Sequence, residues 1–279
     1  MSTILKKIIP KIIGLYLNIL VWFLPKTVAK KAFAVFSKVR KGRVLPHQKA
    51  YLDVAKHKVL ELEGHKIQTY HWEGSKETVL LVHGWESNTW RWHKLIEKLQ
   101  EAGYNIIAFD APAHGYSTGT HLYVPLYATV LQKILLEYAP QHLIGHSVGG
   151  MTLLFNEYNH PNSGIEKIVT VGSPSEFHEI LTHYKNLLGL NKRAMKSLEL
   201  YVFNRFGFKP EEFSSSKFVA NNSKKGLLFH DRLDTIAPYH ASEAVHKQWK
   251  GSKFVSTEGF GHSMHQDEIN DKIIAFLKA

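Results

Sequence analysis

Buried-strand patterns alternate with helical patterns along most of this sequence, and that alternation limits the possible folds more than any other feature. Continuous apolar runs, as expected for strands buried on both faces, occupy residues 78–84, 104–110, 141–146, 165–172 and 226–231. Helical patterns lie between these runs, for example at 87–103. Strands that alternate with helices predict an α/β fold, with a mostly parallel sheet and helices on both of its faces.

Two segments depart from this alternation and set the expected domain boundaries. Residues 175–225 have helical patterns and many aromatic side chains but no buried strand, whereas residues 1–50 are hydrophobic and basic. We therefore expect an N-terminal segment at 1–50, an α/β core at 51–174 and 226–279, and a small helical insertion at 175–225. A chain of 279 residues is long enough for one such domain with its own core.

The composition narrows the chemistry that this chain can perform. It contains no cysteine, which excludes disulfides, cysteine metal sites and a thiol nucleophile. It contains 18 histidines, but they are scattered along the chain, and the sequence contains no H-E-x-x-H motif. We therefore expect neither a metal site nor a cofactor.

The net charge of +11 belongs to the N-terminal segment. Residues 1–50 hold eleven lysines and arginines and no acidic residue, and the remainder holds 24 basic and 24 acidic residues. A protein that binds nucleic acid carries a basic face on its folded body. Because the remainder is neutral, we expect no nucleic-acid partner.

The stretch HLIGHSVGGMTLLF, residues 142–155, places a serine between two glycines at a strand-to-helix junction. Gly145 and Gly149 flank Ser147 and remove side chains that would clash in a sharp turn, and His146 and Val148 are its neighbours. A serine on such a turn stands at the top of the sheet, beside the free N–H groups of a helix N-terminus. A serine that merely caps the helix gives the same pattern, so the motif alone leaves both interpretations open.

A second strand pattern ends at His83 and Gly84, and Trp85 follows in a loop. Acyl transfer by a serine needs two hydrogen-bond donors for the negative oxygen of the tetrahedral intermediate. The backbone N–H groups of Trp85 and Val148 are the candidates for this oxyanion hole, and Gly84 would let the backbone approach closely. An ordinary glycine in a strand-to-helix loop remains the alternative.

A serine nucleophile also needs a base and an acid that orients the base, and the late strands offer both. Asp231 and Asp234 follow one strand pattern, and His262 and His265 follow the next. We expect Asp234 to be the acid, since it lies in a proline-stiffened loop, while Asp231 ties the loop at the strand end. We expect His262 to be the base, because Gly-Phe-Gly before it can bring the ring over the sheet; His265 is expected at the start of the next helix.

With these pieces in this order, the sequence resembles the α/β-hydrolase superfamily over residues 55–279. The matching motifs are His83-Gly84-Trp85, FDAPAHGYSTG at 109–119, GHSVGG at 145–150, HDRLDTIAP at 230–238 and GFGH at 259–262. The resemblance implies an eight-stranded type of sheet, a structural role for Asp110, His114 and Ser117, and a cap over the active site formed by residues 175–225.

The reaction expected from this resemblance is hydrolysis of a carboxylic ester through an acyl-enzyme. Members of the superfamily that open epoxides or remove halides carry an aspartate nucleophile, and the corresponding residue here is Ser147. We expect a small-molecule ester as substrate, with an apolar acyl group bound among the aromatic residues of the cap. Thioester or amide hydrolysis, acyl transfer to an alcohol or amine, and ligand binding without catalysis stay open as alternatives.

The N-terminal segment suggests a membrane surface. Residues 12–25 form an apolar run of 14 residues, which spans about 21 Å as a helix and falls short of the roughly 30 Å of a bilayer core. A second amphipathic helix is expected after Pro25, and basic amphipathic helices suit an anionic lipid interface. We expect residues 1–45 to hold a cytoplasmic protein peripherally on a membrane; packing on the body, a single span and a cleaved signal are the alternatives.

Overall fold

The computed structural model describes residues 3–279, with side chains from residue 8 onward. The chain forms two compact units. The larger comprises residues 39–175 and 215–279, and the smaller comprises residues 1–38 and 176–214. The smaller unit therefore combines the N-terminal segment with most of the expected insertion, two parts of the chain that are far apart in the sequence.

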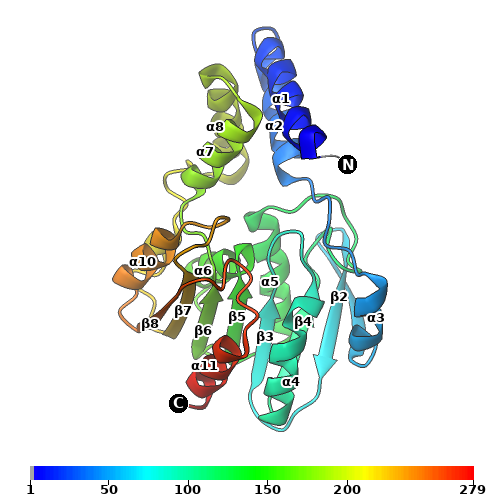
Figure 1. The fold of residues 1–279 in the computed structure, drawn as a ribbon, viewed down its shortest axis with the longest axis vertical. Helices are drawn as coiled ribbons and strands as arrows, with labels where there is room; N and C mark the ends of the chain where they lie inside the picture. Colours follow the sequence, from blue (N-terminus) through cyan, green and yellow to red (C-terminus); the bar gives the residue numbers. More distant parts are fainter. Residues whose placement is uncertain (1–2) are drawn as a thin grey trace. The chain divides into compact units, whose positions relative to one another are not determined.

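The larger unit contains one eight-stranded sheet with the strand order β1-β2-β4-β3-β5-β6-β7-β8 (Figure 1). The strands are β1 (Lys56–Leu62), β2 (His65–Trp72), β3 (Thr78–Val82), β4 (Asn105–Phe109), β5 (His142–His146), β6 (Lys167–Val171), β7 (Lys225–Asp231) and β8 (Ser252–Thr257). The hairpin partners β1 and β2 are antiparallel, β2 is antiparallel to β4, and all later pairs are parallel. The predicted α/β fold with a mostly parallel sheet is confirmed.

Helices cover both faces of this sheet, because successive side chains of each strand point to opposite sides. Val79 and Leu81 of β3 join one core cluster, under α4 (His93–Glu101) and α11 (Asp267–Lys278). Leu80 and Val82 join the other, under α5 (Val124–Tyr138), α6 (Val148–Asn159) and α10 (Tyr239–Gln248). The remaining elements of the unit are α3 (Pro46–Leu52), η1 (Thr89–Trp92) and α9 (Ser215–Phe218).

The strand order reverses direction at β3, which has β4 on one side and β5 on the other. In open parallel sheets, ligands bind beyond the carboxyl ends of the strands at such a reversal. The loop after β3 and the turn after β5 therefore lie side by side at this edge, and the loops after β7 and β8 end at the same edge of the sheet.

The smaller unit consists of α1 (Thr3–Leu20), α2 (Pro25–Ser37), α7 (Phe177–Leu188) and α8 (Lys192–Phe206). α2 packs on α8, where the Phe33 ring lies 5.4 Å from the Tyr201 ring and 5.7 Å from the Phe206 ring. The Tyr184 hydroxyl of α7 donates a hydrogen bond to the Ala32 carbonyl at 2.7 Å.

The apolar face of α2 is thus used inside this unit. Val28, Ala29, Ala32 and Phe33 are buried. This face of α2, which the sequence suggested for a lipid surface, instead packs on α8, where the insertion supplies aromatic partners for Phe33. Within residues 3–279, none of the helices combines the length and the apolar character needed to cross a bilayer.

Candidate active site

Ser147 occupies the turn between β5 and α6 in a backbone conformation that is rare for serine. Its φ is 52° and its ψ is −127°, and its N–H donates to the Val171 carbonyl at 2.9 Å. The turn is tight: a Cβ added to Gly145 would lie 2.7 Å from the Cα of Gly150. A non-glycine residue at positive φ is strained, and such strain gathers where a side chain must be held in a particular place.

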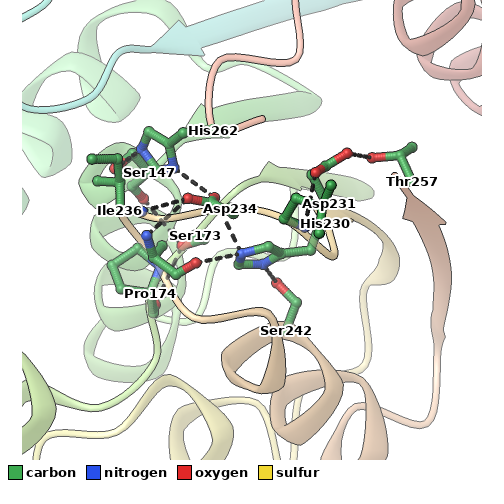
Figure 2. Close-up of polar contacts among 12 residues, drawn as sticks. Ser147, Ser173, Pro174, His230, Asp231, Asp234, Ile236, Ser242, Thr257 and His262 are labelled. Carbon is green, nitrogen blue, oxygen red and sulfur yellow. Dashed lines mark hydrogen bonds and ion pairs between the residues drawn. The ribbon is translucent and has the colours of Figure 1, made fainter. Parts of the chain in front are cut away.

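Two side chains from other loops form a chain of hydrogen bonds that begins at the Ser147 hydroxyl. The His262 Nε2 lies 3.0 Å from the Ser147 Oγ, and the His262 Nδ1 donates to the Asp234 Oδ2 at 2.7 Å (Figure 2). His262 follows β8 and Asp234 follows β7, so three strand ends supply the three residues. The structure therefore brings together Ser147, His262 and Asp234, which the sequence analysis singled out.

The Asp234 carboxylate is fully buried and surrounded by donors. Burial alone would raise its pKa, but hydrogen bonds from His230 and His262 and from the N–H groups of Ile236 and Ala237 outweigh burial and hold the pKa well below its ordinary value. Asp234 is thus a fixed negative charge at neutral pH. It presents one oxygen to the His262 ring and keeps that ring in a single orientation.

Asp231 lies at the end of β7 and faces away from His262, toward the loop after β8. Its carboxylate accepts hydrogen bonds from the Thr257 hydroxyl at 2.8 Å and from three backbone N–H groups, those of Leu233, Gly259 and Phe260. Burial raises the Asp231 pKa and these donors lower it, with a net lowering. Asp231 therefore holds the loop that carries His262.

Because the Asp231 pKa is lowered in the folded state, its stabilising effect is present above the unfolded pKa of about 3.9 and is lost as the pH falls. In Asp231→Asn an amide NH₂ replaces one carboxylate oxygen and cannot accept the hydrogen bonds that this oxygen accepted. Leaving buried donors unsatisfied costs roughly 1–3 kcal/mol. We expect a lower free energy of unfolding in Asp231→Asn at pH 7, measured with urea, and a smaller difference from the parent below about pH 4. An equal difference at both pH values would contradict this account.

The loop after β3 approaches the Ser147 turn closely. A Cβ added to Gly84 would lie 2.9 Å from the Cβ of Ser147, so only glycine fits there. Among the described residues, no protein acceptor receives the N–H of Trp85 or that of Val148. The two donors expected for an oxyanion are therefore unused by the protein and lie in the two loops that meet at this reversal of the sheet.

Three buried histidines shape these loops. The His83 Nε2 accepts the Ala111 N–H at 2.9 Å, and the His114 Nε2 accepts the Glu86 N–H at 2.9 Å. Burial lowers the pKa of His83 to about 4 and that of His114 to about 3, so both rings are neutral and can accept these bonds. The His146 ring is also buried, and burial lowers its pKa well below the ordinary value. None of the three rings is used as an acid or a base in this arrangement.

Asp110 and Ser117 link the loop after β4 to its neighbours. The Asp110 carboxylate accepts hydrogen bonds from the Tyr70 hydroxyl at 2.7 Å and the Thr89 N–H at 2.9 Å. The Ser117 hydroxyl donates to the Asp110 carbonyl at 2.6 Å. These contacts are those of residues that fix a loop, as expected for both from the sequence.

Three residues that the sequence analysis did not single out for these contacts support the pair His262 and Asp234. The His146 Nε2 donates to the His262 carbonyl at 2.9 Å, and the Arg91 guanidinium donates to the Ser263 carbonyl at 2.9 Å. The His230 Nε2 lies 3.3 Å from the Asp234 Oδ2 and 3.1 Å from the Ala237 carbonyl oxygen. Of these three, only His230 had a possible signal in the sequence, because it lies four residues before Asp234 at the end of the β7 pattern.

The other candidates take no part in this arrangement. His265 lies two residues before α11 and not within it, because the helix begins at Asp267. Within residues 3–279, no group of three or more histidine, aspartate or glutamate side chains is placed to hold a metal ion.

Comparison with known proteins agrees with this fold. A sequence model of the family described as alpha/beta hydrolase fold matches residues 77–198. A pimeloyl-[acyl-carrier protein] methyl ester esterase of Vibrio vulnificus is 32% identical over 111 residues, which cover 38% of this chain and 42% of the esterase. The chain thus matches less than half the length of this curated relative.

Solved structures extend the likeness to most of the chain. An esterase of Exiguobacterium antarcticum superposes with a TM-score of 0.63 at 17% identity, over 80% of this chain and 100% of the esterase. Est1E of Butyrivibrio proteoclasticus, in complex with ferulic acid, superposes with a TM-score of 0.65 at 19% identity, over 79% of this chain and 97% of Est1E.

The chain has the fold of the α/β hydrolases, and its similarity to the sequence model of that family extends over residues 77–198.

Proposed function

We propose that this protein is a serine hydrolase that cleaves a carboxylic ester through an acyl-enzyme. One observation carries the proposal: the continuous line from the Ser147 hydroxyl to the His262 ring at 3.0 Å and on to the Asp234 carboxylate at 2.7 Å. Nucleophile, base and orienting acid at hydrogen-bond distance are what a hydroxyl needs to attack a carbonyl.

In the first half of the reaction the Ser147 Oγ attacks the ester carbonyl carbon while the His262 Nε2 takes the hydroxyl proton. The Asp234 carboxylate stabilises the imidazolium that forms. The carbonyl oxygen becomes negative and accepts hydrogen bonds from the N–H groups of Trp85 and Val148. Collapse of this intermediate breaks the ester C–O bond, and the leaving alcohol takes the proton from His262.

In the second half a water molecule replaces the alcohol. His262 takes a proton from the water, which attacks the acyl carbon, and the two N–H donors again bind the negative oxygen. Collapse breaks the bond between the acyl carbon and the Ser147 Oγ, and His262 returns the proton to the serine. One ester and one water give one acid and one alcohol, and the residues of the protein supply every donor and acceptor in these steps.

The substrate class is supported by the relatives. The Vibrio vulnificus relative is named for hydrolysis of a methyl ester, and the Exiguobacterium antarcticum structure is that of an esterase. We propose a small-molecule ester with an apolar acyl group for this chain as well. Buried apolar surface on the acyl group would contribute to binding, at about 25 cal/mol per Å².

A fluorophosphonate probe tests the proposal directly, since it phosphonylates activated serines. We expect stoichiometric labelling of the full-length protein, with the modified peptide containing Ser147, and turnover of p-nitrophenyl esters of rising chain length. Turnover that requires an added alcohol or amine would instead favour acyl transfer. A protein that is folded but neither labels nor hydrolyses any ester of the series would refute the proposal.

His230 is expected to position the acid. Its ring is fully buried, its Nδ1 pairs with the Ser242 hydroxyl at 2.7 Å, and its Nε2 faces both the Ala237 carbonyl and Asp234 (Figure 2). In His230→Ala, Asp234 loses one donor and holds the protonated His262 ring more tightly. We expect kcat to fall by roughly 10-fold with KM little changed, by analogy with outer-sphere partners of functional histidines.

The pH profile separates positioning from mere stability. A tighter hold on the protonated His262 ring moves the acid limb of the kcat/KM profile of His230→Ala to higher pH. Ser242→Ala, which removes the hydroxyl on the far side of the His230 ring, is the matched control and should move this limb less. An unchanged limb in His230→Ala, with activity lost only through unfolding, would contradict the positioning role.

A further inference from the structure

The outer side of α1 in the smaller unit is an unusual stripe of large apolar side chains. Ile12 is 60% exposed, Leu15 61%, Ile19 58%, Trp22 63% and Phe23 78%. Ile8 and Tyr16 are also exposed, and together these residues recur every three or four positions along α1 and the turn after it. We call these seven residues the α1 stripe: Ile8, Ile12, Leu15, Tyr16, Ile19, Trp22 and Phe23.

The opposite side of α1 packs on the protein, with Leu17 buried and two polar side chains bonded to α7. Lys11 donates to the Asn186 carbonyl at 2.7 Å, and Asn18 donates to the Gly189 carbonyl at 2.8 Å, so both satisfy the carboxyl end of α7. A Cβ added to Gly14 would lie 1.8 Å from the Leu188 carbonyl oxygen. A helix on the surface of a protein in water turns its polar side outward. In α1 the outward side instead carries large apolar side chains, so it is suited to an apolar medium.

The unit that carries the α1 stripe is strongly basic. The smaller unit holds 13 basic and 5 acidic residues, so +8 of the net charge of +11 lies on fewer than a third of the residues. Two of these cations touch the stripe: the Arg193 guanidinium lies 4.5 Å from the Trp22 ring and the Lys31 ammonium 5.8 Å from the Tyr16 ring. Tryptophan and tyrosine beside arginine and lysine are typical of the boundary between lipid headgroups and acyl chains.

From this apolar outward side and the basic charge of the unit we propose that the α1 stripe inserts into the interface of an anionic lipid surface. The helix lies in the plane of the interface, with its apolar side chains among the upper acyl chains. Lys31 and Arg193 stay at the level of the anionic headgroups. A second copy of this chain is a poorer occupant, because two such faces would bring like charges together.

The attachment is made by the same unit that contains α7 and α8, since α1 is bonded to the carboxyl end of α7. The insertion helices are thus held at the lipid surface together with the N-terminal helices. A free amphipathic anchor, by contrast, would detach from the rest of the protein when its linker is cut.

Flotation of the full-length protein with vesicles tests the proposal. The vesicles contain phosphatidylcholine alone or phosphatidylcholine with 30% phosphatidylglycerol, in low salt. We expect flotation with the anionic vesicles and about tenfold weaker binding to the neutral ones, since each basic residue near the surface adds about 1 kcal/mol. The triple variant Ile12→Gln, Leu15→Gln, Ile19→Gln should bind the anionic vesicles roughly 100-fold more weakly.

The matched control has three substitutions by glutamine at exposed apolar residues of the larger unit. Val54, Val59 and Leu136 are exposed to a similar degree, and Val54→Gln, Val59→Gln, Leu136→Gln should float like the parent. Equal binding by the α1 triple variant and the parent would overturn the proposal. So would loss of folding in the α1 triple variant, or a parent that fails to float and forms dimers which the variant cannot form.

Quenching of tryptophan fluorescence by brominated lipid provides a second test that needs no destabilising change. Of the six tryptophans, Trp22 is the most exposed, while Trp72, Trp92 and Trp249 are buried. We expect brominated anionic vesicles to quench the parent, and Trp22→Phe to bind equally well but lose most of the quenching. Binding without quenching of Trp22 would place the lipid contact elsewhere and overturn the proposal.

Lipid binding by the α1 stripe does not depend on ester hydrolysis. Turnover of a short, water-soluble p-nitrophenyl ester should be equal in the parent and in the α1 triple variant. Measured on the same samples, it distinguishes failure of the lipid proposal from failure of the proposed hydrolase activity.

Discussion

Ser147→Ala is expected to lower kcat for any ester substrate by roughly 10⁴- to 10⁶-fold, the loss typical of removing the nucleophile from a Ser-His-Asp arrangement. The alanine cannot form the acyl-enzyme, and His262 then has no hydroxyl to deprotonate. Folding should be preserved, because a methyl group fits wherever the serine side chain fits. Rates are measured with p-nitrophenyl esters, and folding by circular dichroism and by the midpoint of thermal unfolding.

The matched control for this change is Ser263→Ala. Ser263 is exposed and follows His262 directly, and only its backbone carbonyl is used, by Arg91. Its variant should keep nearly the full rate and should still label with the fluorophosphonate, whereas Ser147→Ala should not label. If Ser147→Ala hydrolysed esters as fast as the parent, the proposed mechanism and the role of His262 within it would both be wrong.

The sheet was predictable because its signals are local. Each parallel strand is buried on both faces and therefore appears as a continuous apolar run, and each helix covers the sheet with one side only. β3, with Val79 to Val82 fully buried, shows this most clearly. Strand ends and the order of the loops along the chain then place Ser147, Asp234 and His262 at the same edge of the sheet, although 115 residues separate the first from the last.

The contacts that hold these residues could not be read in the same way. His146 reaches the carbonyl of a residue 116 positions away, and Arg91 reaches one 172 positions away. Such bonds depend on the relative position of two loops in the folded structure, and no local pattern in the sequence encodes that position. His230 was closer to prediction, since it is four residues before Asp234, but a histidine in a strand has many possible partners.

The N-terminal segment shows a different limit. Lys11, Gly14 and Asn18 fall on one side of α1 by their spacing, and a polar stripe on an apolar helix is typical of contact with water. In the structure this stripe contacts α7, because carbonyls at the end of that helix need donors and a glycine lets the two backbones meet. Periodicity identified the two sides of α1, but only the partner decides which side faces outward.

The second large effect is expected at the acid. Asp234→Asn should lower kcat by about 10⁴-fold, because an amide in place of the carboxylate favours the wrong tautomer of His262 and no longer stabilises the imidazolium. The His262 Nδ1 donates to the Asp234 Oδ2 at 2.7 Å, so the loss acts at the ring that takes the serine proton. The rate is measured at saturating ester, where KM effects do not contribute.

Asp231→Asn is the matched comparison, with the same chemical change three residues earlier on the same loop. Asp231 has no contact with the His262 ring, and its donors lie in the loop that carries His262. Its variant should therefore lose stability with a decrease in kcat of about tenfold or less, since misplaced loops cost far less than a lost charge on the base. The reverse ranking of the two kcat values would move the role of the acid to Asp231, and equal losses would mean that the loop and not the charge on Asp234 limits the rate.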